Sequence, residues 1–154
     1  MEITVRPAGE RHLESLVALL ETLFAIEADF TFDGGKQRTG IARLLDDGKS
    51  CVLVAEHEGE VVGMVTVQTV ISTAEGGAVG WVEDLVVKEE FRGCGIGRRL
   101  LEYLERWAAD AGLARLQLLA DRNNAPALGF YERLGWAGTG LIALRRYPRP
   151  DETK

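Results

Sequence analysis

The sequence predicts an α+β domain arranged as an α/β/α sandwich, with about four helices around a mixed, mostly antiparallel sheet of six or seven strands. Three observations predict this class. Two segments with helical periodicity come first, and three Val- and Thr-rich strands joined by short turns follow them. A strongly amphipathic helix then separates the third of these strands from a further one, which is the order of a crossover between parallel strands.

Composition is that of an ordinary globular domain. The chain has 154 residues, of which 46% are hydrophobic and 27% charged, so we expect one domain with a real core. A net charge of −6 argues against a nucleic-acid partner. Cys51 and Cys94 lack metal-ligand spacing, so no metal site is expected. We expect a cytoplasmic protein, because the sequence shows no signal-peptide pattern and no apolar run of membrane-spanning length.

The N-terminal third predicts one strand and two helices. Residues 2–6 alternate apolar and polar side chains and end at Pro7, which indicates a short strand. Apolar residues at helical spacing over 13–24 predict an amphipathic helix, and a shorter one is expected at about 36–46. The segment 27–35 between them combines aromatic residues with acids.

Three consecutive strands follow. Residues 51–57 and 60–73 are rich in Val and Thr, and the Glu58-Gly59 pair between them predicts a two-residue hairpin turn. Residues 79–87, WVEDLVV with its neighbours, form the third strand after a Gly-rich turn. Short turns join antiparallel neighbours, so these three strands should form a meander.

The C-terminal part begins with a helix from Ile96 that Gly112 ends. Residues 114–120 form a strand that should run parallel to the one before the helix. A helix over 124–134 begins at an Asn-Ala-Pro start, and a last strand is expected at 140–146. We therefore predict a single domain over residues 1–147 and a flexible tail at 148–154.

Glycines at the start of the strong helix suggest an anion site. A P-loop is excluded, because Gly97 is followed by Arg98 and another arginine rather than Lys-Ser/Thr. A dinucleotide fingerprint would need its last glycine at position 98, and an antiparallel meander is the wrong context for it. Gly93 and Gly95 nevertheless let successive N–H groups face one ligand at a helix N-terminus, and Arg92 flanks the turn. The alternative interpretation is a tight strand-to-helix connection with solvated arginines.

Two motifs together resemble the GNAT N-acetyltransferase superfamily. The run LVVKEEFRGCGIGRRLL is similar to the family's acetyl-CoA motif, in which Arg/Gln-x-x-Gly-x-Gly/Ala opens a helix after a strand. A second block, N-x-x-A-x-x-F-Y-x-x-x-G-W from Asn124 to Trp136, resembles the later motif of the family. One departure is Lys88-Glu89-Glu90, where the family often carries Pro. The motifs occur in the family's order, and the resemblance spans nearly the whole chain.

The resemblance implies acetyl-CoA as cosubstrate and the GNAT fold. The pyrophosphate would lie on the amides from Arg92 to Arg98, and the pantetheine arm would pair with the strand before the loop, which requires a splayed sheet with an open edge. The implied contacts with the cosubstrate are Leu85, Val86, Val87, Arg92, Gly93, Cys94, Gly95, Ile96, Gly97, Arg98, Asn124, Ala127 and Tyr131.

The same resemblance implies catalytic roles. Tyr131 corresponds to the tyrosine that protonates the departing thiolate, and Glu83 to a glutamate that acts as base. The alternative role of Tyr131 is packing in the core, and that of Glu83 is a solvated position on its strand. In strict alternation Asp84 points away from Glu83, although a bulge could change that phase. An acetyl-Cys94 intermediate is a rival route, but neither histidine is near Cys94 in the motif, so a turn residue is favoured.

We therefore expect an N-acetyltransferase that moves an acetyl group from acetyl-CoA to a primary amine by direct attack. Phe24, Glu27, Phe30 and Glu83 are the candidate contacts of the amine, because acids with aromatics suit a cation. Amino acids, polyamines, aminoglycosides and protein amines stay open as acceptors. A homodimer is expected, with neither nucleic acid nor membrane as partner. The alternatives are a non-catalytic acyl-CoA-binding sensor and a nucleotide-binding module.

Overall fold

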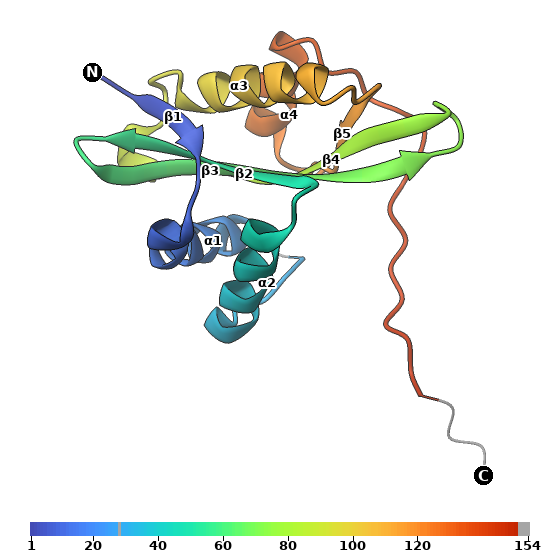
Figure 1. The fold of residues 1–154 in the computed structure, drawn as a ribbon, viewed down its shortest axis with the longest axis horizontal. Helices are drawn as coiled ribbons and strands as arrows, with labels where there is room; N and C mark the ends of the chain where they lie inside the picture. Colours follow the sequence, from blue (N-terminus) through green and yellow to red (C-terminus); the bar gives the residue numbers. More distant parts are fainter. Residues whose placement is uncertain (28, 151–154) are drawn as a thin grey trace. The chain divides into compact units, whose positions relative to one another are not determined.

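The structure, a computed structural model, describes residues 1–27 and 29–150 (Figure 1). It forms two compact units, Met1–Leu118 and Leu119–Lys154. The strands are β1 (Thr4–Pro7), β2 (Ser50–His57), β3 (Glu60–Ser72), β4 (Gly77–Val87) and β5 (Leu116–Leu118). The α-helices are α1 (Leu13–Ile26), α2 (Gly34–Asp46), α3 (Ile96–Asp110) and α4 (Ala125–Arg133).

The first unit contains the sheet, with the strand order β1-β2-β3-β4-β5. Strands β1 to β4 are antiparallel, whereas β5 runs parallel to β4 as the crossover through α3 predicts. Helices α1 and α2 cover one face of the sheet and α3 covers the other (Figure 1). The predicted α/β/α class is therefore confirmed.

The predicted number of strands is wrong. The described residues form five strands, and the expected last strand at 140–146 is irregular chain. Its Leu141, Ile142 and Leu144 are 80%, 71% and 89% exposed. Apolar pattern alone does not make a strand, because unpaired backbone N–H and C=O groups need a neighbouring strand. The single domain over 1–147 stays a prediction, and the expected tail at 148–154 lies partly outside the described residues.

The hairpin between β2 and β3 has the predicted turn. Glu58 and Gly59 have φ values of 49° and 80°, and two left-handed residues in sequence match the twist of a tight antiparallel hairpin. The turn sets the register of the two central strands, and that register divides their side chains between the two faces.

Each face of the sheet has its own apolar layer. Val52, Val54 and Met64 pack with α1 and α2. On the opposite face, a Cβ at Gly63 would lie 3.3 Å from Ile96 and Leu100 of α3. Side chains alternate along a strand, so residue 64 of β3 faces α1 and residue 63 faces α3. This assignment decides below which face the candidate site occupies.

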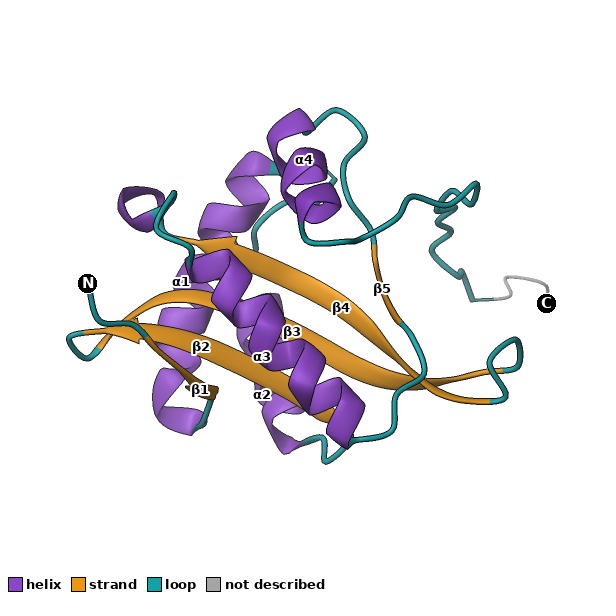
Figure 2. Cartoon of the chain, turned by 90° about the horizontal axis from the view of Figure 1, so that it is seen from above, coloured by secondary structure: helices purple, strands orange, loops and turns teal. Residues whose placement is uncertain are grey.

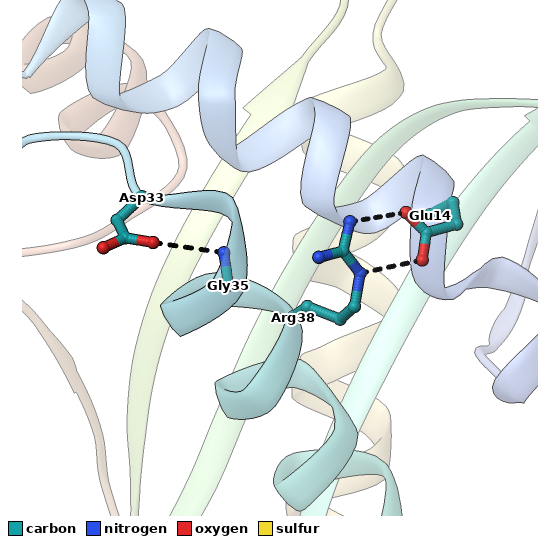
Figure 3. A network of polar contacts seen from close by, with 4 residues as sticks. All are labelled: Glu14, Asp33, Gly35 and Arg38. Carbon is teal, nitrogen blue, oxygen red and sulfur yellow. Dashed lines mark hydrogen bonds and ion pairs between the residues drawn. The ribbon is translucent and has the colours of Figure 1, made fainter.

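Helices α1 and α2 are joined by polar contacts at their N-terminal ends (Figure 3). The Asp33 carboxylate accepts hydrogen bonds from the amides of Gly35 and Lys36 and so caps α2. The Arg38 guanidinium donates to both carboxylate oxygens of Glu14, each at 2.9 Å. This hydrogen bond lowers the pKa of Glu14, but both groups are exposed, so the pair orients the helices more than it stabilises them.

Strand β5 is short and lies close to β4. It pairs only through Gly80–Leu116, Trp81–Gln117 and Val82–Leu118. A Cβ at Gly80 would lie 2.6 Å from Leu116 Cδ2, 3.0 Å from Val67 and 3.1 Å from Leu113. The missing side chain of Gly80 therefore permits the approach of β5 to β4.

We expect Gly80→Ala to lower the free energy of unfolding by about 1–3 kcal/mol, because three apolar side chains must move to admit one methyl group. Urea denaturation followed by circular dichroism measures the change. Gly77→Ala is the matched control on the same strand, since a Cβ there meets nothing within 4 Å. Equal stability of the two variants would contradict the assigned role of Gly80.

Candidate active site

Strand β4 loses its neighbour halfway along its length. Its last pair with β5 is Val82–Leu118, whereas pairing with β3 continues to Val87. Among the described residues no strand pairs with 83–87 on the β5 side. Figure 2 shows β5 beside only the part of β4 next to the β3–β4 turn. In the described chain the edge of β4 is therefore unpaired over 83–87, where the family resemblance implies an open edge.

A β-bulge lies at the start of this open segment. The register between β3 and β4 shifts between Met64 and Thr66, so one residue of β3 stands opposite two of β4. Asp84, at the bulge, has a left-handed φ of 58°. A bulge changes the alternation of side chains, and this one changes which acids share a face.

Both acids of the bulge lie on the α1 face. Glu83 stands directly opposite Thr66, which faces the same side as Met64, and the Asp84 carboxylate contacts the Thr66 hydroxyl. Val86 also packs in the α1 cluster. Strict alternation along β4, which would separate Asp84 from Glu83, therefore does not hold.

The two carboxyl groups have different partners. The buried Thr66 hydroxyl lies 3.1 Å from the Glu83 carbonyl oxygen and 3.2 Å from Asp84 Oδ2. The Trp81 side chain hydrogen-bonds the Glu83 carboxylate. Glu83 is therefore held by a group that only donates, whereas Asp84 meets a hydroxyl that can donate or accept.

Desolvation raises the pKa of both acids, although the Glu83 side chain is exposed and Asp84 is half-buried. Desolvation, followed by repulsion from Glu83 and Glu27, raises the pKa of Asp84 to about 6, and the Thr66 hydrogen bond opposes this shift. Desolvation also raises the pKa of Glu83, against the hydrogen bond from Trp81. The bulge thus holds a carboxyl group that changes protonation state near neutral pH.

The end of α1 reaches the same region. Glu27, the C-cap of α1, is half-buried and acts electrostatically on Asp84. The rings of Phe24 and Phe30 pack with centroids 5.7 Å apart. Phe24 packs against the core cluster on the α1 face, so the predicted acceptor residues at the end of α1 and in the loop after it lie on the same side of the sheet as Glu83. This grouping combines aromatic surface with three carboxyl groups.

The glycine loop presents unbonded amides. Gly93 and Gly95 have φ values of 76° and 80°, and α3 starts after Gly95 with no side-chain cap. In the described part of the chain, the backbone N–H groups from Gly93 to Arg98 donate no hydrogen bond. The Arg92 amide differs, because it donates to the Glu89 carbonyl. Unbonded amides at a helix N-terminus attract an anion.

The flanking arginines have protein partners. Arg92 Nε donates to the Val87 carbonyl at 3.0 Å, which ties the loop to the end of β4. Arg98 pairs with Glu102 along the surface of α3 at 2.8 Å. Such an exposed pair is weak, so Arg98 can exchange it for a phosphate.

The two cysteines differ in exposure. Cys94 is exposed and its sulfur contacts the carbonyl of Arg92 in its own turn at 3.7 Å, which agrees with a small turn residue. Cys51 is buried, and burial raises the pKa of its thiol to about 11. A thiol in that state is a poor nucleophile.

The second motif lies in the second unit, where packing and capping occupy its residues. Asn124 Oδ1 accepts a hydrogen bond from the Ala127 amide and caps α4. Tyr131 packs edge-to-face on Phe130 and Trp136, at centroid distances of 5.4 and 6.0 Å. The half-buried phenol of Tyr131 can pack in this way and still donate its O–H.

Sequence reasoning missed Thr66. It treated this residue as one polar position in a Val-rich strand. A threonine between Val65 and Val67 at a buried position is the signal that could have identified it, because a buried hydroxyl needs a partner.

Across residues 1–27 and 29–150 no helix is long and apolar enough to cross a membrane, and no three His, Cys, Asp or Glu side chains are grouped to hold a metal.

Residues 18–136 match the family model of the acetyltransferase (GNAT) family. The chain belongs to the GNAT acetyltransferase family. The predicted family membership is therefore confirmed.

Solved structures share the GNAT fold over nearly their whole length. A transcriptional regulator from Bacillus halodurans C-125 is 25% identical over 95% of this chain and 99% of that chain, with a TM-score of 0.82. AAC(6')-Iy in complex with the bisubstrate analog CoA-S-monomethyl-acetylneamine is 17% identical over 97% and 100%, with a TM-score of 0.81. A ribosomal-protein-alanine N-acetyltransferase from Brucella melitensis biovar Abortus 2308 is 22% identical over 96% and 100%, with a TM-score of 0.76.

Stability should depend on pH through Asp84. Its pKa is about 6 in the folded chain and about 3.9 when unfolded, so its contribution to stability is greatest below pH about 4 and falls as pH rises to 6. Asp84→Asn stays neutral and tolerates the left-handed backbone. We expect the stability of this variant relative to wild type to rise by roughly 2 kcal/mol between pH 4 and pH 7.

Urea denaturation at pH 4, 5, 6 and 7 measures this difference. Asp110→Asn, at the exposed end of α3, is the control for the loss of one negative charge. A stability difference between Asp84→Asn and wild type that does not change with pH would contradict the assigned protonation of Asp84.

Proposed function

We propose that this GNAT family member is an acetyl-CoA-dependent N-acetyltransferase that acetylates a primary amine by direct attack. One observation carries the proposal. The unbonded amides of 93–98 and the unpaired edge of 83–87 meet through the Arg92–Val87 hydrogen bond. An anion site that continues into an open strand edge suits a phosphate-bearing ligand with an amide-containing arm.

The residues present fit acetyl-CoA. Gly93 and Gly95 leave open space where a Cβ would stand, so a pyrophosphate can approach the backbone closely. Leu85, Val86 and Val87 offer the strand edge for the arm. Bound acetyl-CoA supplies a thioester as acyl donor. The role of the chain is to orient that donor and exclude competing water.

Acetyl-CoA supplies the acyl group, so the side chains of the protein have to carry out the proton transfers. The acceptor amine must lose a proton before its nitrogen can attack, and a carboxylate of the β4 bulge is placed to receive it. Glu83 is the candidate from sequence. Tyr131 is the candidate acid for the departing thiolate.

The acceptor is proposed to be a cationic amine bound on the α1 face. Glu27, Glu83 and the Phe24–Phe30 pair supply carboxylates and aromatic surface for it, which suits an ammonium group. The choice of acceptor stays wide, because one similar structure, AAC(6')-Iy, is an aminoglycoside N-acetyltransferase and another is a ribosomal-protein-alanine N-acetyltransferase. A cytoplasmic location and a homodimer stay predictions.

A second candidate is a non-catalytic acyl-CoA-binding sensor. The 25% identical neighbour that is named a transcriptional regulator favours it. A sensor would bind acetyl-CoA through the same loop and strand edge but would release no free CoA with any amine.

An amine panel tests the proposal. The purified chain is incubated with acetyl-CoA and with amino acids, polyamines, aminoglycosides or peptides, and free thiol is measured. We expect amine-dependent thiol release with a matching acetylated product by mass spectrometry. Acetyl-CoA binding in calorimetry without thiol release from any amine would favour the sensor instead.

Gly95→Ala tests whether the loop carries the donor site. A side chain at φ 80° costs about 1–2 kcal/mol, so we expect the KM for acetyl-CoA to rise about tenfold. Gly40→Ala, on α2 with open space at its Cβ, is the matched control and should leave this KM unchanged.

Tyr131→Phe should lower turnover at saturating acetyl-CoA by about 10²-fold or more, because the thiolate then leaves without its proton donor. The ring contacts with Phe130 and Trp136 are retained in this variant, so its stability should match wild type. Full turnover would remove the acid role and leave Tyr131 as a packing residue.

A further inference from the structure

Asp84 holds an uncommon backbone conformation. It and Glu58 are the non-glycine residues with positive φ in the described part of the chain. The hairpin turn explains Glu58, because both of its central residues must be left-handed. Asp84 instead lies inside strand β4. Strained positions of this kind persist where the surrounding structure holds them, and they concentrate at functional sites.

Counting the hydroxyl proton of Thr66 distinguishes two states of Asp84. Thr66 has one proton and two oxygen neighbours, the Glu83 carbonyl at 3.1 Å and Asp84 Oδ2 at 3.2 Å. When Asp84 is ionised, the Thr66 hydroxyl can donate its proton to only one of these two oxygens. When Asp84 is protonated, it donates to Thr66, and Thr66 donates to Glu83. The Thr66 hydroxyl can therefore bond Asp84 in either state, although as a donor it favours the carboxylate and lowers the pKa of Asp84.

Glu83 lacks this property. Its carboxylate accepts from the Trp81 side chain, whose indole N–H only donates and therefore cannot accept a hydrogen bond from a protonated Glu83. The charged groups that face Asp84 are Glu83 on its own strand and Glu27 from α1. Both are acids, and both favour a proton on Asp84.

We propose that Asp84, rather than Glu83, receives the proton that the acceptor amine releases, and that Thr66 changes from donor to acceptor as it does so. The inference rests on the proposed acetyl transfer. Asp84 stands where β4 has just lost its β5 neighbour. An arm that followed 85–87 from the glycine loop would reach the bulge that holds this residue.

The transfer balances as follows. The ammonium group of the acceptor gives one proton to the Asp84 carboxylate, which leaves a neutral amine and a carboxylic acid. The nitrogen lone pair forms the new C–N bond, the C–S bond breaks, and a second proton from nitrogen neutralises the charge of the leaving thiolate. Asp84 then returns its proton to water. The products are the acetamide, CoA as free thiol and one proton.

Electrostatics agrees with this role. A pKa of about 6 leaves Asp84 mostly ionised at pH 7, ready to accept a proton, and makes it a stronger base than an ordinary aspartate.

The test compares pH profiles of kcat/KM for the best amine of the panel. Wild type should show an acidic limb near pH 6. Asp84→Asn should lower kcat/KM at pH 7 by about 10²-fold or more and abolish the limb. Glu83→Gln should retain a limb at lower pH, because the charge of Glu83 raises the pKa of Asp84. Thr66→Val removes a hydrogen bond that lowers the pKa of Asp84, so its limb should move to higher pH, and Thr66→Ser should restore it. Asp110→Asn is the control for charge.

A second readout needs no turnover. Carboxyl ¹³C NMR of the protein follows the titration of Asp84, identified by its absence in Asp84→Asn. Adding the amine without acetyl-CoA should lower the midpoint, because a nearby cation favours the carboxylate. An unchanged midpoint would overturn the contact between the amine and Asp84.

The outcomes separate the two proposals. An active wild type whose acidic limb survives in Asp84→Asn and disappears in Glu83→Gln would overturn the role of Asp84 and leave acetyl transfer intact. A wild type that binds acetyl-CoA but acetylates no amine would overturn both.

Discussion

The early end of the pairing between β4 and β5 is the constraint on which the candidate site depends. Gly80 allows Leu116 to approach β4, yet the two strands share only three residue pairs before they part after Val82. Because β3 continues to pair with β4, the open segment stays ordered while one edge of its backbone is left for a ligand. A fully paired β4 would have no edge to offer.

The two ends of this open segment differ in the sign of their electrostatic potential. Beyond Val87, the loop before α3 presents unbonded N–H groups and the positive end of a helix dipole. At the other end, the bulge gathers Glu83 and Asp84 with Glu27 of α1. A donor with phosphates at one end and a reacting carbonyl at the other matches this order, and a cationic acceptor matches the acidic end. The bulge also lets one buried hydroxyl, that of Thr66, serve both a carbonyl and a carboxyl group.

Local sequence signals predicted much of this arrangement. Glu58-Gly59 specified its own turn, the glycines at 93 and 95 adopt the left-handed conformations that only glycine takes readily, and Asn124 caps α4 at the predicted start. In each case the decisive interaction lies within a few residues of the signal. The segment 140–146 failed for the opposite reason, since a strand requires a partner that the pattern of one segment cannot specify.

By itself, the sequence determined the order of the elements from β1 to α4, the family, and the glycine turn before α3, because periodicity, glycine conformation and motif spacing are local properties. Only the tertiary structure decided where β5 leaves β4 and which face Asp84 occupies. Both depend on pairing between segments distant in sequence: Thr66 of β3 must meet β4 across a shifted register before Asp84 can turn to the α1 face beside Glu83. Alternation along one strand predicts the wrong face for Asp84, because the bulge that reverses it arises from the pairing of two strands.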